Sequence, residues 1–234
     1  HLCSQLYGNA VWQRRRRELI QHGGDYMEKY FIGIDSGTSG IKAVLFDLKG
    51  NELGQKSFPL KGIFPREDMY EEDMLEIWEK AVKCVKAVTG AFPDKEVVGI
   101  GITAQGDGLW MVDENMEPVR NGCCFCDGRA AKIVDRWVED GTCDKLFEIT
   151  GTRIFTGNQN GIVKWMEEHE PENLNRSRWL LHLKDYLFYR FTGKITTDAT
   201  DQSLIFLDQN KRDYLDETFK ICEIEKYKDK YPPV

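Results

Sequence analysis

The chain has 234 residues, of which 41% are hydrophobic, so it is long enough to bury a proper core as one large domain. No run of apolar residues approaches the length of a membrane span, and the formal net charge of −7 argues against a nucleic-acid partner. The seven cysteines are an odd count with no secretory segment ahead of them, so we expect a reduced, cytoplasmic setting rather than a disulfide framework.

Residues 1–26 differ from the rest of the chain. They show neither strand nor helix periodicity and carry four consecutive arginines, Arg14 to Arg17. These arginines outweigh two acidic residues, so the net charge without the segment is −9. We expect Met27 to be the natural start and the segment to be a translated leader or an added stretch outside the fold. The alternative is a basic targeting arm.

Residues 30–47 predict a β-hairpin with a polar, glycine-rich tip. Both arms are rich in Ile, Val and Phe, and Gly37 and Gly40 would let backbone N–H groups turn toward one point. Such a nest suits phosphate oxygens, and Asp35 could hold Mg²⁺ directly or through water. The candidate phosphate-binding residues are Gly37, Thr38, Ser39 and Lys42. The alternative is an ordinary turn built from Asp, Ser and Gly.

A strand, a helix and a second strand are predicted next. Residues 52–60 would complete a meander with the hairpin. The acidic residues 71–73 would lie in the first turn of a helix, whose apolar positions continue at helical spacing to residue 88. Residues 97–103 are almost continuously apolar, which is typical of a strand buried on both faces.

A polar loop follows this strand, over residues 104–113. Open α/β sheets bind ligands at the carboxyl ends of their strands. Gln105, Gly106 and Asp107 are therefore candidates for binding sugar hydroxyls, although a plain turn is the alternative.

The connection over residues 121–129 has the same character and leads into a helix predicted for 130–139. It contains Asp127 beside Arg129. Its cysteines, Cys123, Cys124 and Cys126, have no second Cys/His pair at suitable spacing, so we do not expect a zinc site.

Six motifs occur in the order seen in the FGGY carbohydrate kinases. They are Asp35-Ser-Gly-Thr-Ser-Gly40, the stretch 99–113, Cys126-Asp-Gly-Arg129, Trp165-Met-Glu-Glu-His-Glu-Pro171, the stretch 184–193, and Thr197-Asp-Ala-Thr-Asp201. Over residues 27–234 the chain therefore resembles the N-terminal, sugar-binding domain of this family. It looks most like the branch of L-xylulose (3-keto-L-gulonate) kinases, with erythritol and other pentulose kinases close behind.

The resemblance implies an α/β, ribonuclease-H-like fold, as in actin and the Hsp70 ATPase, with a mixed sheet flanked by helices. It implies ATP and Mg²⁺ as cofactors and transfer of a phosphoryl group to a primary hydroxyl of a ketopentose or related sugar or polyol. It also implies that Asp127 is a further sugar-binding residue, beside Gln105, Gly106 and Asp107. The expected partner is a small-molecule sugar, with no nucleic acid and no membrane, and the full-length protein could be a homodimer. The catalytic base and the domain that closes over ATP are expected C-terminal to Val234, so the 234-residue chain alone should be inactive.

Two residues depart from the family pattern. Phe125 stands where many relatives have Trp, and Ile162 replaces a Lys, so the sugar is less firmly implied than the reaction. Asp198 and Asp201 are interpreted as loop-ordering residues. Two other functions share some of these features, an actin- or Hsp70-like ATPase domain and a non-catalytic sugar-binding module.

Overall fold

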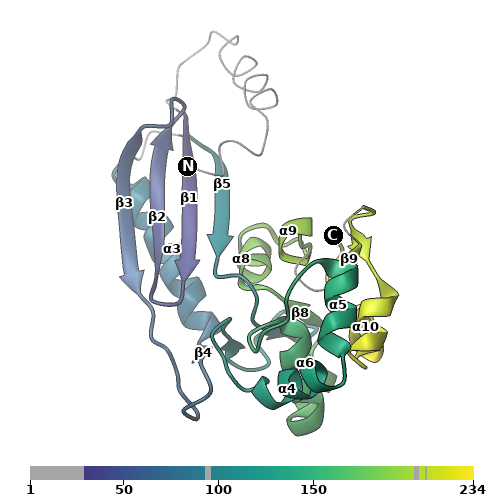
Figure 1. Ribbon diagram of the computed structural model, residues 1–234. Coiled ribbons are helices and arrows are strands. Elements are labelled where there is room, and N and C mark those ends of the chain that lie inside the picture. The colour runs from purple at the N-terminus through teal and green to yellow at the C-terminus, as the bar shows by residue number, and fades with distance from the viewer. Residues whose placement is uncertain (1–28, 93–95, 203–205, 209) are drawn as a thin grey trace.

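The computed structural model describes residues 29–92, 96–202, 206–208 and 210–234, so the expectation for residues 1–26 lies outside the described part of the chain. One half of the molecule is a four-stranded sheet in the order β3-β2-β1-β5 (Figure 1). Its strands are β1 (Lys29–Gly37), β2 (Gly40–Asp47), β3 (Glu52–Pro59) and β5 (Glu96–Ala104). The first three form the predicted antiparallel meander, and β5 runs parallel to β1.

The helix α3 (Met74–Gly90) packs against this sheet and lies behind it in Figure 1. The carboxylate of Asp73 caps the helix by accepting from the backbone N–H groups of Leu75 and Glu76. The prediction for residues 71–73 is therefore correct only for Asp73. Residues 71 and 72 instead form β4 (Glu71–Glu72), which pairs with β7 (Gly122–Cys123) fifty positions along the chain, a long-range contact that helical periodicity does not reveal.

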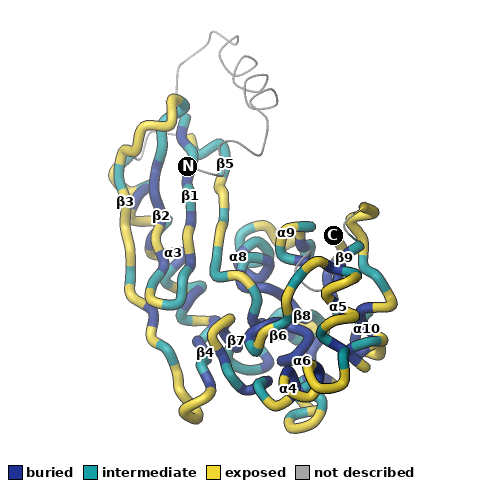
Figure 2. The backbone as a smooth tube through the Cα atoms, viewed as in Figure 1, coloured by how far each residue is buried: buried dark blue, intermediate teal, exposed yellow. Residues whose placement is uncertain are grey.

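The prediction that residues 97–103 are buried on both faces is wrong. In the described part of the chain, β5 lies at the edge of the sheet, and Ile100, Gly101 and Thr103 on it are exposed. Figure 2 shows the same pattern, with exposed and partly exposed stretches along β3 and β5 and buried positions along β1 and β2. The apolar run reflects pairing with β1 and packing on α8 (Leu183–Thr192) rather than burial on both sides.

The other half of the molecule is mainly helical and has its own core. Leu109, Trp165, Phe206 and Phe219 are among its buried apolar residues. Its helices are α4 (Ala131–Glu139), α5 (Thr142–Thr150), α6 (Gln159–His169), α7 (Pro171–Arg176), α9 (Ala199–Gln202), α10 (Asp216–Ile221) and the 3₁₀-helix η1 (Glu225–Lys230). The short strands β6 (Trp110–Val112) and β8 (Trp179–Leu181) pair with each other, as do β9 (Leu207–Asp208) and β10 (Asp213–Tyr214).

Strand β6 joins the two halves. Trp110 and Val112 belong to the sheet-side core, whereas Leu109 and Met111 belong to the helical core. The chain thus passes directly from the end of β5 through a polar loop into the boundary between the two cores. Among the described residues, no helix is both long enough and apolar enough to span a bilayer.

Candidate functional site

The residues predicted to bind phosphate and metal lie at the turn of the β1–β2 hairpin and on the strand ends beside it. Asp35 and Lys42 are direct cross-strand partners, and both are exposed. Neither Gly37 nor Gly40 has a positive φ, so the predicted use of unusual glycine conformations is wrong for this hairpin. A Cβ on Gly40 would lie 2.9 Å from the carbonyl oxygen of Phe58, so the glycine at position 40 instead allows the close approach of β3.

Three loops meet beside this hairpin, and we refer to residues 105–108, 122–129 and 155–158 together as the loop cluster. Asp107 and Gly108 both have positive φ, at 54° and 73°. A Cβ on Gly108 would lie 2.3 Å from the carbonyl oxygen of Cys123, and a Cβ on Gly157 would lie 1.6 Å from that of Phe125. The three loops therefore pack backbone against backbone, which only glycine at these two positions permits.

Asp107 is held in this conformation by a side chain that sequence reasoning missed. The Nδ2 of Asn158 donates to Oδ1 of Asp107 at 2.6 Å, and Asn158 itself is buried. Burial raises the pKa of Asp107, while the hydrogen bond from Asn158 lowers it in part. Left-handed backbone at residues other than glycine clusters at functional sites, so the conformation of Asp107 marks this loop as a candidate binding site.

Gln105 points the other way, into the interior. Its Nε2 donates to Oε2 of Glu72 at 2.8 Å, and its backbone N–H donates to the carbonyl oxygen of Ser36. Burial raises the pKa of Glu72 from its ordinary value of 4.5 to about 7, although hydrogen bonds from Cys124 and Gln105 oppose the shift. The Nε2 bond to Glu72 thus supports the loop from behind, while the Oε1 of Gln105 is buried without a hydrogen-bond partner among the described residues.

Asp127 is fully buried and its carboxylate is saturated. It accepts from the backbone N–H of Tyr70 and from the backbone N–H, Nε and Nη2 of Arg129. Those four donors use the roughly four acceptor positions of a carboxylate. Direct contact between Asp127 and a sugar stays a prediction, and this geometry favours a structural role, in which Asp127 and Glu71 together hold the buried guanidinium of Arg129.

Tyr70 connects the hairpin to the loop cluster. Its backbone N–H donates to Asp127, and its Oη donates to the carbonyl oxygen of Thr38 at 3.2 Å. One residue, Tyr70, therefore links a predicted phosphate residue to a predicted sugar residue, through its side chain on one side and its backbone on the other. No pattern in the sequence marks Tyr70 for this role, because its partners lie more than thirty positions away in both directions.

An acidic group lies at the start of α8. The Nζ of Lys184 bridges the carboxylates of Asp185, Asp198 and Asp201 at 2.9, 2.9 and 3.2 Å. Asp198 also accepts from the backbone N–H groups of residues 200 and 201, as expected for a loop-ordering residue. His182, Asp185 and Asp201 offer ligand atoms within 4.8 Å of one another, and the ammonium of Lys184 already pairs with both of these carboxylates.

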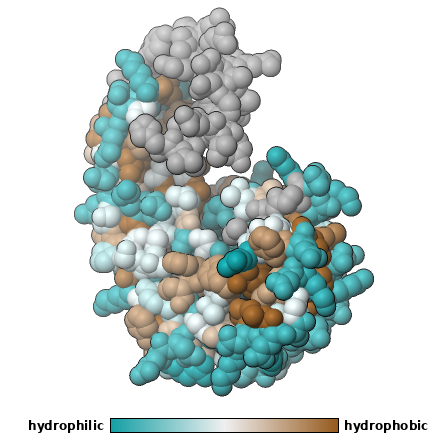
Figure 3. All heavy atoms as spheres, viewed as in Figure 1, coloured by the Kyte–Doolittle hydropathy of each residue, from teal (hydrophilic) through white to brown (hydrophobic). Residues whose placement is uncertain are grey.

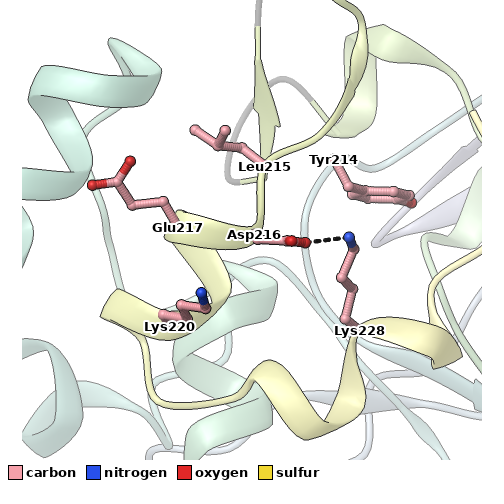
Figure 4. Close-up of a pocket in the computed structure, with 6 residues that line it drawn as sticks. All are labelled: Tyr214, Leu215, Asp216, Glu217, Lys220 and Lys228. Atoms are coloured by element: carbon pink, nitrogen blue, oxygen red, sulfur yellow. Dashed lines mark hydrogen bonds and ion pairs between the residues drawn. The ribbon is translucent and has the colours of Figure 1, made fainter.

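A separate cavity of about 590 Å³ lies away from the loop cluster, on α10 and η1 (Figure 4). Tyr214, Asp216, Lys220 and Lys228 are among its lining residues, and Asp216 pairs with Lys228 across it. It is open to solvent, and its charged lining residues are partly used up by this ion pair. Figure 3 shows one face of the molecule, on which hydrophobic residues are exposed over both halves and hydrophilic residues lie around them.

Comparison with known sequences matches residues 30–234 to the model of the FGGY family of carbohydrate kinases, N-terminal domain. The chain is 37% identical over 169 residues to the L-xylulose/3-keto-L-gulonate kinase of Escherichia coli K12, covering 71% of this chain and 34% of that protein. It is 28% identical over 205 residues to the erythritol kinase of Brucella abortus, covering 87% of this chain and 39% of that protein. The chain thus spans little more than a third of the length of these two relatives.

Solved structures show the same fold. The gluconate kinase of Lactobacillus acidophilus superposes with a TM-score of 0.82 at 24% identity, over 88% of this chain and 42% of that one. A xylulose kinase of Brucella ovis superposes with a TM-score of 0.80 at 25% identity, over 87% of this chain and 42% of that one. The predicted sugar-kinase, actin-like fold with a mixed sheet is therefore confirmed.

Proposed function

The chain belongs to the FGGY family of carbohydrate kinases, and on that premise we propose that it is the sugar-binding N-terminal part of an ATP-dependent kinase for a ketopentose or related polyol. The phosphoryl acceptor is a primary hydroxyl of an open-chain sugar such as L-xylulose. The observation that carries the proposal is the loop cluster, in which backbone packing and a buried amide fix Asp107 beside the end of the parallel strand β5.

Asp107 is the first candidate contact for the sugar. Its Oδ2 makes no hydrogen bond to another described residue, and an ionised carboxylate can only accept, so it suits a sugar hydroxyl that donates. Gly106 is exposed and allows a ligand to approach the backbone, whereas Gln105 and Asp127 act from behind by holding the loops. Pre-formed acceptors of this kind lower the entropic cost of orienting a sugar hydroxyl.

The hairpin is the candidate site for Mg-ATP, which supplies the transferable phosphoryl group and the charge that neutralises it. Its residues fit the group: Asp35 and Lys42 are exposed and adjacent across the two strands, and Ser39 at the turn is exposed as well. An exposed carboxylate suits a hydrated magnesium ion, and an exposed ammonium suits a phosphate oxygen. Gly37 and Thr38 complete the turn on which these side chains stand.

The base that accepts the hydroxyl proton is proposed to come from outside the 234 residues, together with the part that closes over ATP. Asp107 is the carboxylate of the loop cluster that competes for this role, because burial raises its pKa and makes it a better base than an exposed aspartate. The actin- or Hsp70-like alternative gives no reason for the Asp107 loop. A sugar-binding role without turnover remains the expectation for the 234-residue chain on its own.

A coupled assay of ADP release tests the proposal. The 234-residue chain and the same chain joined to a C-terminal half of this family are each given Mg-ATP with L-xylulose, D-xylulose or erythritol. We expect sugar-dependent turnover only from the joined protein. Turnover by the 234-residue chain that disappears in Asp107→Ala would place the base inside this sequence, and a joined protein active without sugar would contradict a sugar kinase.

A further inference from the structure

Asn158 connects two of the loops in the loop cluster through its buried side chain. Its Oδ1 accepts from the backbone N–H of Phe155 at 2.7 Å, and its Nδ2 donates to Oδ1 of Asp107 at 2.6 Å. Asn158 immediately precedes α6, so its position is set by a helix that packs in the helical core. The amide orientation is determined by its partners, because a backbone N–H can only donate and an ionised carboxylate can only accept.

The hydrogen bond from Asn158 makes the two carboxylate oxygens of Asp107 differ in their hydrogen bonding. Oδ1 is occupied by Asn158, whereas Oδ2 has no hydrogen-bond partner among the described residues. Asp107 also has a positive φ, and the next residue, Gly108, packs its backbone closely against the carbonyl oxygen of Cys123. The carboxylate can therefore present one acceptor edge in one direction.

We propose that Asn158 is a positioning residue for the sugar site, which holds Oδ1 of Asp107 so that Oδ2 accepts a hydroxyl hydrogen from the ligand. The inference rests on the proposed function and sharpens it, because the ligand must carry a hydroxyl donor at this point. A ligand with a carbonyl or a hydrogen there would leave Oδ2 unpaired and bind more weakly.

The charged groups around Asp107 predict how the arrangement depends on pH. His182, which precedes α8, favours the ionised form of Asp107, and Asp201 on α9 disfavours it. Burial is the largest influence and raises the pKa of Asp107, while Asn158 opposes burial by stabilising the carboxylate. Removing the amide should therefore raise the pKa of Asp107 further, so sugar binding should be lost at a higher pH on the acid side.

The test measures L-xylulose affinity by titration calorimetry on the 234-residue chain across a range of pH. We expect Asn158→Ala to weaken binding by about tenfold, the scale of one hydrogen bond to a charged group, and to shift the acid loss of affinity to higher pH. In an Asp107→Asn background the same change should have no further effect, because the two residues act as one unit. Asn160→Ala, which alters a buried amide on the same helix without touching Asp107, is the matched control and should keep the parent affinity.

Asn158→Asp is the sharper variant, because it keeps the bond to the Phe155 N–H and changes only the group that faces Asp107. Two carboxylates in hydrogen-bond contact share one proton and repel each other once it is lost. We expect the affinity of this variant to fall on the alkaline side, where the parent chain shows no loss. Melting temperatures at each pH establish that the chain stays folded.

Equal losses from Asn158→Ala in both backgrounds, or a parent-like pH profile for Asn158→Asp, would overturn the positioning role. Full affinity in Asp107→Asn would contradict the proposed function itself. A loss in Asp107→Asn with none in Asn158→Ala would contradict only the inference.

Discussion

The end of the β1–β2 hairpin and the loop cluster lie side by side but are built in opposite ways. The hairpin keeps regular pairing up to Gly37 and Gly40 and exposes Asp35 and Lys42 to solvent. The loop cluster has strained backbone at Asp107 and buried polar contacts between segments far apart in the chain. The linking residue, Tyr70, bonds to both.

This difference matches the two roles proposed for these regions, phosphate binding at the hairpin and sugar recognition at the loop cluster. A site that must meet a mobile triphosphate needs exposed charges and gains from a second body that closes on it. A site that must recognise hydroxyls needs acceptors fixed beforehand, and fixing them costs burial and strain that the surrounding fold must offset. Changes in the loop cluster should therefore affect folding strongly, whereas equivalent changes in the hairpin should affect it little.

The largest effect is expected from Asp127→Ala. The change leaves the buried guanidinium of Arg129 with only part of its partners, and breaking a buried ion pair costs about 3–5 kcal/mol of unfolding free energy. Asp35→Ala is the matched change in the hairpin and should stay within about 0.5 kcal/mol, as for an exposed side chain. Urea unfolding measures the free energy of unfolding of both variants. Equal losses would contradict the expectation that the loop cluster matters more for folding than the hairpin does.

Glycine substitutions come next. In Gly157→Ala the new Cβ would have to displace the backbone at Phe125, which should cost about 3 kcal/mol or more. In Gly37→Ala the nearest atom is 3.9 Å away, at Gly40, so the cost should be below about 1 kcal/mol. Thermal melts compare the two, and a Gly157→Ala chain as stable as Gly37→Ala would show that the loops can relax.

A smaller, pH-dependent effect is expected at Glu72. Its pKa in the fold is about 7 against an ordinary 4.5, so ionisation opposes folding, and this cost grows as pH rises from 4.5 through about 7. Glu72→Gln removes the cost and should be more stable than the parent by about 1–3 kcal/mol above that range, with the difference vanishing below it. Urea unfolding near pH 4 and near pH 8 measures this difference in stability. Glu79→Gln, on the exposed face of α3, is the control, and a constant gain at both values would rule out the ionisation of Glu72 as the cause.

Local patterns predicted the hairpin, the third strand and most of α3 correctly, because alternation and helical spacing act over neighbouring residues. The ordered motifs predicted the fold, and one of them contains Asp107, the candidate sugar-binding residue. What they could not predict depends on distant contacts. The pairing of Glu71 with Cys123, the bond from Asn158 to Asp107 and the bond from the Tyr70 backbone to Asp127 each join residues more than fifty positions apart. The exposed edge of β5 depends on its place in the sheet rather than on its own composition.

The most direct test of the account is whether this chain binds sugar through the loop cluster without the hairpin. L-xylulose is titrated into the 234-residue chain and into its Asp107→Ala and Lys42→Ala variants. We expect the parent to bind, Asp107→Ala to lose about 1.5–3 kcal/mol of binding free energy, and Lys42→Ala to bind the sugar as the parent does. Unchanged affinity in Asp107→Ala, or an equal loss in Lys42→Ala, would show that the sugar does not bind through the loop cluster alone.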